Sequence, residues 1–594
     1  MIPKSAGISP PGGKPRFNCR PRSLWLLLTV MVAASAGIRV LAYLYWGTGT
    51  IESEGAEYAK IAENLRNGVG YVGLVLPGPQ VHFPPLFPFL IAGASFLTND
   101  YELAGRLVAL ILGSLLPLPV FGIASRLFNR PVGIIAGMLT LLYPLSVYLS
   151  FMVLSEGPYA TLILTAVYLV VRTLNGSTVR SWALIGGAFG ICYLLRAEAL
   201  APFAISVLFA FFATCGSRIF RFRLAASAIV VFLLVALPEI IFIHGATGRV
   251  EFETKSTNLL FMAKRVLAAE SAPGVDFVSS SGLHDVPSPT PDDPGDVFPW
   301  EVQWAYYGID SQLNETGAAM RSWVDIATEE HVKPKEVFRI LLSGVGRNIA
   351  VMFNYFSSGW LGAPLLAGLA LLGVFRRPWH RPRASVRFYV ALVAAAPIAS
   401  TFVVLWYADP RYYFIFVPFL CIWAANGLYG IGLWIRASCK AAGWNILVRY
   451  RFVQWIIPGL LGLAIVTSPI KKVRALYEFA DSAPPFSVDK AVGLWIGSQQ
   501  SRPIRVMDLS LPLSFHAGAQ QQLYFPYCTE DLALRYLNKV RPDFIVLRHG
   551  EKYTRYYEEW LANGIPDQQV ELVRLPPLAG SEKFVIYRWH PAGS

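Results

Sequence analysis

The sequence predicts an all-α polytopic membrane protein with about eleven transmembrane helices, helices lying along its outer face and a small C-terminal α/β domain. Of its 594 residues, 54% are hydrophobic and only 15% are charged, whereas soluble domains are about 25% charged. The hydrophobic residues form runs of about 20, the length that crosses a bilayer. From residue 471 onward this pattern gives way to short apolar stretches separated by turns.

The predicted spans lie at 24–46, 103–125, 132–151, 157–171, 182–196, 199–215, 224–243, 359–375, 388–406, 412–435 and 452–470. The N-terminal tail and every second connection are 1–23, 126–131, 172–180, 216–223, 376–387 and 436–451. These segments carry 21 of the 51 Lys and Arg residues and none of the 38 Asp and Glu residues. The positive-inside rule therefore places them, and the N-terminus, in the cytoplasm. The net charge of +13 indicates topology, not nucleic-acid binding.

The same topology divides the chain into three parts: a basic cytoplasmic tail (1–23), a membrane domain (24–470) and an extracytoplasmic domain (471–594). With an odd number of spans the C-terminus lies outside, and so do the long loops 47–102 and 244–358. We expect a protein of the inner membrane that acts at its outer face. Neither a P-loop nor a dinucleotide-binding glycine motif is present, which argues against a nucleotide-sugar donor.

The sequence of the first outer loop predicts two helices that lie along the membrane surface and form a roof over the outer ends of the spans. Tyr58, Ile61, Ala62 and Leu65 follow helical spacing, and Gly68 suits the end of that helix. A second apolar stretch, 86–97, is too short to span and begins after prolines. In the tail, short strands are predicted at 504–509, 544–547, 570–573 and 584–587.

Carboxylates near the outer ends of the spans are the first candidates for chemistry, because a charge at the bilayer is costly. Glu54 lies one turn before Tyr58 on the apolar face of the predicted helix, which favours a functional role over a solvated helix start. For Glu52 and Glu57 a solvated helix start is equally open, because acids suit a helix N-terminus. Glu156 is either functional or a helix cap. Glu198 follows Arg196 so closely that an internal ion pair is favoured.

Cations at the same level are the second set of candidates: Arg39, Arg106, Lys255 and Arg411. A phosphate group would need such cations at the depth of the lipid headgroups. Arg106 and Arg411 begin spans on the outer side, so snorkelling at the interface is their alternative reading. His82 has no partner histidine nearby, which favours a hydrogen-bonded loop residue over a metal ligand.

Several segments together resemble glycosyltransferase family 39. They are the stretch from Glu54 to Tyr71, His82-Phe-Pro-Pro-Leu-Phe-Pro, Arg106-Leu, Leu154-Ser-Glu and Arg411-Tyr. Their order and spacing, over about 24–435, make the resemblance specific. The family holds protein O-mannosyltransferases and bacterial aminoarabinose (lipid A) transferases, so the resemblance implies a GT-C fold and a polyprenyl-phosphate sugar donor.

The resemblance also implies roles for particular residues. Glu54 matches the proposed general base, although the family usually has Asp there, so Glu52, Glu54 and Glu57 all stay open as the base. Glu156 matches an acid that helps to hold the acceptor or a metal. Arg411-Tyr412 matches a segment near the donor phosphate. The remaining candidates for substrate binding are Glu57, Tyr58, His82, Arg106 and Lys255.

Two features of the second outer loop bear on this assignment. The segment 237–241 departs from the Pro-Trp-x-x-Arg-Asn pattern common in relatives, which weakens the placement of Lys255. The stretch 271–298, rich in Pro, Asp, Ser and Gly, resembles the family's lid that becomes ordered on binding.

We therefore expect an inverting glycosyltransferase that moves a sugar from a polyprenyl-phosphate donor to a lipid, glycan or protein acceptor outside the membrane. No cofactor is required by the sequence, a divalent metal stays open, and nucleic acid is not an expected partner. Membrane lipids surround the chain. The alternatives are a transporter of polyprenyl-linked lipid or sugar, which needs charges deep in the spans, and a polysaccharide ligase or polymerase.

Overall fold

The fold is known from a computed structural model of the chain. It describes residues 21–46, 50–174, 176–214, 216–255, 260, 324, 333–357, 364–376, 381–400, 410–444, 450, 452–470, 486–500, 502–526, 530–549, 555–577 and 580–590. The tail before residue 21 and the expected lid at 271–298 lie outside these residues.

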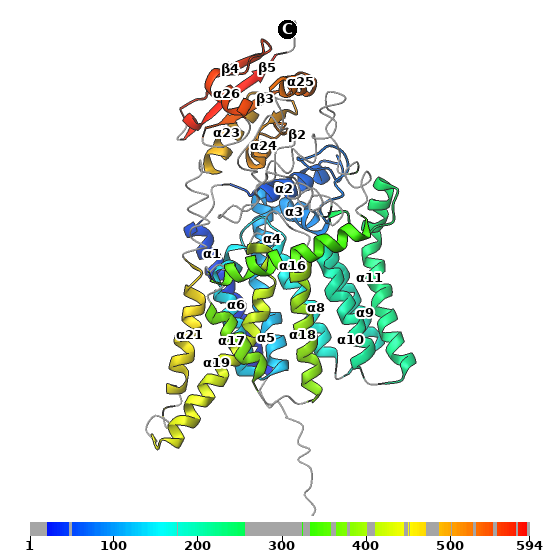
Figure 1. Cartoon of the computed structure of the whole chain (residues 1–594), viewed down its shortest axis with the longest axis vertical. Helices are drawn as coiled ribbons and strands as arrows, with labels where there is room; N and C mark the ends of the chain where they lie inside the picture. Colours follow the sequence, from blue (N-terminus) through cyan, green and yellow to red (C-terminus); the bar gives the residue numbers. More distant parts are fainter. Residues whose placement is uncertain are drawn as a thin grey trace, which may run out of the picture.

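The membrane part is helical (Figure 1). Its helices are α1 (Pro21–Trp46), α2 (Ser53–Arg66), α3 (Leu86–Thr98), α4 (Tyr101–Leu115), α5 (Pro117–Leu127), α6 (Arg130–Leu142), α7 (Pro144–Tyr148), α8 (Glu156–Thr173), α9 (Val179–Leu195), α10 (Leu200–Ala213), α11 (Arg218–Thr247), α16 (Pro334–Ser357), α17 (Pro364–Phe375), α18 (Arg381–Ser400), α19 (Phe416–Ala441) and α21 (Ile456–Thr467). Short 3-10 turns lie at η1 (Ala197–Ala199), η3 (Pro410–Tyr413) and η4 (Val453–Trp455).

Each predicted span overlaps a described helix, with one correction, while residues 359–363 and 401–406 of the predicted spans lie outside the described residues. Four helical stretches are long and apolar enough to cross a membrane within the part of the chain that the structure describes, and further apolar helices are shorter. The number of crossings therefore stays a prediction. The expected span 132–151 is not one helix: α6 ends at Leu142 and Pro144 starts the short α7. Pro144 lacks the backbone N–H that would continue the hydrogen bonds of α6, and the chain from 149 to 155 is irregular.

The roof over the bundle is built as predicted from α2 and α3 (Figure 1). Gly68 follows α2 with a φ of 74°, a conformation that glycine adopts without strain. Glu57 turns inward from α2 and holds the next loop: one oxygen accepts from the Leu74 and Val75 amides at 2.6 and 3.1 Å. The other accepts from the Gln80 side chain at 2.6 Å. Gly73 has to lack a side chain, because a Cβ there would strike the Glu57 carboxylate.

The C-terminal domain is the predicted α/β unit (Figure 1). Its elements are α23 (Phe486–Ser498), β1 (Arg505–Met507), α24 (Leu511–His516), β2 (Gln521–Leu523), α25 (Glu530–Val540), β3 (Phe544–Arg548), α26 (Arg555–Asn563), β4 (Val570–Val573), η5 (Ser581–Lys583) and β5 (Phe584–Trp589). The sheet order is β2-β1-β3-β5-β4, parallel from β2 to β3 and antiparallel beyond. Strand β2 was not predicted, because Gln521-Gln-Leu is short and lacks alternation.

Polar contacts dock this domain on the outer loop and on the start of α4. The Nε2 atom of His516 lies 2.7 Å from the Thr50 hydroxyl, and Lys490 donates to Glu102 at 2.9 Å. The amide of Gln522 in β2 donates to the carbonyl of Leu74 at 2.9 Å. The edge strand of the sheet is thereby bonded to the loop that Glu57 holds.

We predict that Glu57 and Gln80 can exchange roles. Glu57→Gln places an amide group against the amide of Gln80, and Gln80→Glu places two carboxylates together, so each single variant loses about 1–3 kcal/mol of stability. The double variant restores a donor facing an acceptor and recovers most of the loss. Apparent melting temperatures in detergent at pH 8 test this, above the pKa of about 7 to which burial raises the Glu57 carboxyl. A double variant no better than the single variants would contradict the prediction.

We also predict that docking weakens in acid. Burial lowers the pKa of His516 to about 4, from 6.5. The charged groups that face it are Glu102, Lys490, Asp100 and Asp489. Because the released imidazole binds more protons than the docked one between these values, stability is full above about pH 6.5 and falls as the pH approaches 4. The apparent melting temperature of His516→Gln should fall less over this window; parallel curves would contradict the assignment.

Candidate active site

An ion pair joins the first outer loop to the last part of the membrane domain. Glu54 stands in the first turn of α2, and its Oε2 lies 3.1 Å from Nη1 of Arg411 in η3. Both side chains are partly exposed, at 16% and 17%. The guanidinium of Arg411 also lies over the Tyr412 ring, 5.4 Å from its centroid. The structure therefore brings together three of the residues expected at the site, Glu54, Arg411 and Tyr412.

A second charge cluster lies beside the first and is centred on Arg196, which caps the end of α9. Arg196 binds Glu156 at 2.9 Å and Glu198 at 2.8 Å, so the expected pair with Glu198 is present and is shared. It also donates to the hydroxyl of Ser155 at 3.1 Å, and that hydroxyl lies 3.4 Å from the Tyr58 hydroxyl. Glu156 begins α8, and its second oxygen has no hydrogen-bond partner among the described residues. Arg411 acts electrostatically on Glu156, which links the two clusters.

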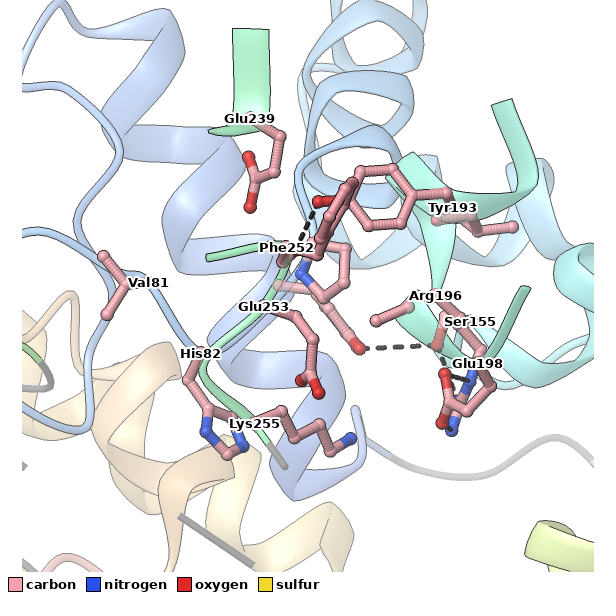
Figure 2. Close-up of a pocket in the computed structure, with 14 residues that line it drawn as sticks. Val81, His82, Ser155, Tyr193, Arg196, Glu198, Glu239, Phe252, Glu253 and Lys255 are labelled. Atoms are coloured by element: carbon pink, nitrogen blue, oxygen red, sulfur yellow. Dashed lines mark hydrogen bonds and ion pairs between the residues drawn. The ribbon is translucent and has the colours of Figure 1, made fainter. Parts of the chain in front are cut away.

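A pocket opens beside these clusters (Figure 2). Its lining includes Tyr58 and His82 from the roof, Arg196 and Glu198 from the end of α9, and Lys255. In Figure 2, Val81 and His82 lie on one side and Arg196 and Glu198 on the other. Polar groups thus line a partly apolar pocket, which is the usual make-up of a ligand site.

His82 and Lys255 lie together in this pocket (Figure 2). Burial, with a smaller effect from the Lys255 ammonium, holds the pKa of His82 well below its usual value. The imidazole is therefore neutral at physiological pH. The backbone amide of His82 is bound to the Gln80 side chain, so the loop held by Glu57 also positions this residue.

Two of the residues expected to bind substrate, Arg106 and Glu57, are buried and bonded to groups of the protein itself. Arg106 is buried and binds Glu102 at 2.8 Å, the carbonyl of Phe151 at 3.0 Å and the carbonyl of Thr50 at 2.7 Å. It neither snorkels nor reaches the pocket. Glu57 is buried as well, with both oxygens bonded to the loop, so it is neither a solvated helix-start acid nor a free base. The sequence could not show this, because the partners lie up to 56 residues away.

Glu52 is the third acid of the first loop, and its carboxylate is also engaged. Its Oε2 accepts from the amide of Val153 at 2.8 Å, and its Oε1 lies 3.9 Å from Arg106. Among the three candidates for the base, Glu54 alone is paired with a residue expected at the donor phosphate, Arg411.

Tyr193, Glu239 and Glu253 are among the pocket residues that the sequence analysis missed. Glu239 lies within the long apolar helix α11, and an acid inside such a helix is itself a signal of function. It stands in the segment that departs from the family pattern. Tyr193 bonds the carbonyl of Phe252 and so holds the chain that carries Glu253 and Lys255.

A metal site is not formed by the described residues. No three His, Cys, Asp or Glu side chains gather there in a way that would hold an ion. The free oxygen of Glu156 offers one ligand atom, whereas divalent cations bound by oxygen take several.

Part of this chain matches a known protein family, and its fold is similar to that of solved structures. Residues 82–242 match the family described as dolichyl-phosphate-mannose-protein mannosyltransferase. ArnT from Cupriavidus metallidurans, solved with undecaprenyl phosphate, has 12% sequence identity and a TM-score of 0.52 over 96% of this chain and 98% of that one. No curated protein sequence matches the chain significantly.

An archaeal enzyme shares the fold as well. The oligosaccharyltransferase of Archaeoglobus fulgidus, tethered to an acceptor peptide, has 13% identity and a TM-score of 0.56 over 89% of this chain and 69% of that one. AglB from the same organism, with an inhibitory peptide and a dolichol-phosphate, has 13% identity and a TM-score of 0.52 over 88% and 69%. The predicted resemblance and the GT-C fold are confirmed, and the chain is a multi-pass membrane protein.

We predict unequal costs for removing the members of the Arg196 cluster. Arg196→Gln leaves the buried Glu156 and the partly buried Glu198 without their shared cation, so we expect a loss of about 3–5 kcal/mol. Glu198→Gln keeps the pair with Glu156 and should cost clearly less. Thermal unfolding of both variants in detergent measures the difference; equal losses would show that Arg196 is not the shared partner.

Proposed function

We propose that this chain is a membrane glycosyltransferase similar to those of family 39, and that it transfers one sugar, with inversion, from a polyprenyl phosphate to an acceptor on the outer side of the membrane. The observation that carries the proposal is the ion pair between Glu54 and Arg411, in which Glu54 acts electrostatically on Tyr58 of the pocket lining. A base and a cation in contact are the two groups that such a transfer needs. The ligands of the similar structures, undecaprenyl phosphate and dolichol-phosphate, support the donor class.

Arg411 is assigned to the donor phosphate. As the bond between sugar C1 and the phosphate oxygen breaks, that oxygen takes up negative charge, which a guanidinium stabilises through charge-assisted hydrogen bonds. The incoming phosphate competes with Glu54 for Arg411. Donor binding would thus exchange one anion for another beside the same cation, so the charge of Arg411 is never left without a partner.

Glu54 is assigned as the general base. Once Arg411 has turned to the phosphate, the Glu54 carboxylate is free to accept the proton of the acceptor while the acceptor oxygen or nitrogen bonds to C1. The polyprenyl phosphate leaves from one face of C1 and the nucleophile attacks the opposite face, which gives inversion. A carboxylate needs to lie within hydrogen-bond reach of the acceptor, and the partial exposure of Glu54 permits it.

The acceptor is assigned to the cavity beside the pair. Ser155 lines this pocket, and the adjacent Glu156 has one carboxylate oxygen without a partner among the described residues, which could bind the acceptor. Lipid, glycan and protein acceptors all carry groups that could bind there. The Lys and Arg residues of the segments expected in the cytoplasm support a site on the outer side of the inner membrane.

We predict different defects in Glu54→Gln and Arg411→Ala. Glu54→Gln loses the base and should lower turnover by about 100-fold or more while donor binding persists. Arg411→Ala loses the phosphate partner and should weaken donor binding itself. Purified protein, a panel of polyprenyl-phosphate sugars and an acceptor extract allow release of free polyprenyl phosphate and donor affinity to be measured separately.

Glu63→Gln is the matched control, since Glu63 lies on the same helix and pairs with Lys60 on its other face. It should retain activity. Full activity of Glu54→Gln would refute the base assignment, and tight lipid binding without release across the panel would refute the transferase in favour of a carrier.

A further inference from the structure

The contacts of the C-terminal domain converge on the start of α2. His516 binds the hydroxyl of Thr50, which lies four residues before Glu54. The carbonyl of the same Thr50 accepts from Arg106 at 2.7 Å. Thr50 is buried, and its hydroxyl and its carbonyl both have partners on other elements. The chain therefore enters α2 from an anchored position.

A series of ion pairs also connects the C-terminal domain to the start of α2. Lys490 of α23 binds one oxygen of Glu102 at 2.9 Å, and Arg106 binds the other at 2.8 Å. Arg106 in turn lies 3.9 Å from Glu52, the residue that precedes α2. The ammonium of Lys490 thus helps to hold Glu102, and through it the guanidinium that anchors the entry to α2.

A third contact holds α2 further along. The amide of Gln522 binds the carbonyl of Leu74, while the amide of Leu74 binds Glu57. One residue of the loop therefore connects the edge of the C-terminal sheet to the first half of α2. Glu54 lies between the two anchored points, Thr50 and Glu57.

We propose that the C-terminal domain positions Glu54 for proton transfer, with His516 and Lys490 as positioning residues that fix the entry to α2. The inference rests on the assignment of Glu54 as the general base. A carboxylate that must meet an acceptor proton is sensitive to its placement, and displacement of a reacting group by about 1 Å can cost about 100-fold in rate. The domain would be part of the catalytic apparatus although none of its described residues lines the pocket.

The test separates turnover from donor binding. His516→Ala and Lys490→Met should each lower kcat by about 10-fold or more, with KM for the polyprenyl-phosphate sugar unchanged within about twofold, because Arg411 is untouched. His516→Gln restores a group that can bond the Thr50 hydroxyl and should recover most of kcat. Lys539→Met, at an exposed position of α25 in the same domain, is the matched control for Lys490→Met and should behave like the wild type.

A double-mutant cycle adds a second readout. Thr50→Val removes the hydroxyl that His516 binds while keeping the shape of the side chain, so it should lower kcat like His516→Ala. The double variant should be no slower than either single variant, because the two changes break the same contact.

Three results would overturn the positioning role. One is an unchanged kcat in both His516→Ala and Lys490→Met. Another is a loss of kcat that follows the melting temperature and is not recovered in His516→Gln, which would indicate a structural effect. The third is a rise of KM in step with any loss. Failure of the proposed function is distinct, since it would appear as full activity of Glu54→Gln while His516→Ala is still slow.

Discussion

The buried guanidinium of Arg106 is the interaction on which the outer face of this protein depends. It is only 4% exposed and binds three separate segments: the entry to α2 at Thr50, the start of α4 at Glu102 and the irregular chain at Phe151. Removing one partner of a buried charge costs far more than the pair itself contributes. The three segments consequently have to keep their relative positions, and Glu54 takes its place from them.

The irregular chain between α7 and α8 carries this constraint into the membrane domain. Arg39 of α1 is fully buried and donates to the hydroxyls of Ser146 and Ser150 at 3.0 and 2.8 Å. Non-helical backbone inside a membrane bundle requires such internal partners, because lipid supplies none. The segment so held delivers the Val153 amide to Glu52 and the Ser155 hydroxyl to Arg196. A cation deep in α1 thereby contributes to the geometry of the site.

The sequence predicted the helices and strands well, but it predicted poorly which groups their charged side chains bind. The reason is physical. Helices α2 and α3 and the strands β3, β4 and β5 follow from local periodicity, which each segment carries by itself. The roles of Arg106 and Glu57 depend on groups that only folding brings near, such as the Leu74 amide. Their charges looked like those of a substrate site because a buried structural charge and a functional one occur at the same depth. Glu239 is the opposite case, because it was not predicted although the sequence carried a signal for it. It is an acid within an apolar helix, and it lines the pocket.

The arrangement also explains why Glu54 and Arg411 are the pair suited to react. Arg106 and Arg196 each bind several groups within the protein, so a phosphate could reach either of them only by breaking a buried network. Arg411 and Glu54 meet at 3.1 Å between partly exposed side chains, and the nearby Tyr412 ring faces the same guanidinium. An anion from outside can replace Glu54 beside Arg411, because the guanidinium then exchanges one anionic partner for another and the Glu54 carboxylate is partly exposed to water. The buried networks of Arg106 and Arg196 thus fix the frame, and the partly exposed pair of Glu54 and Arg411 can change partners during a reaction.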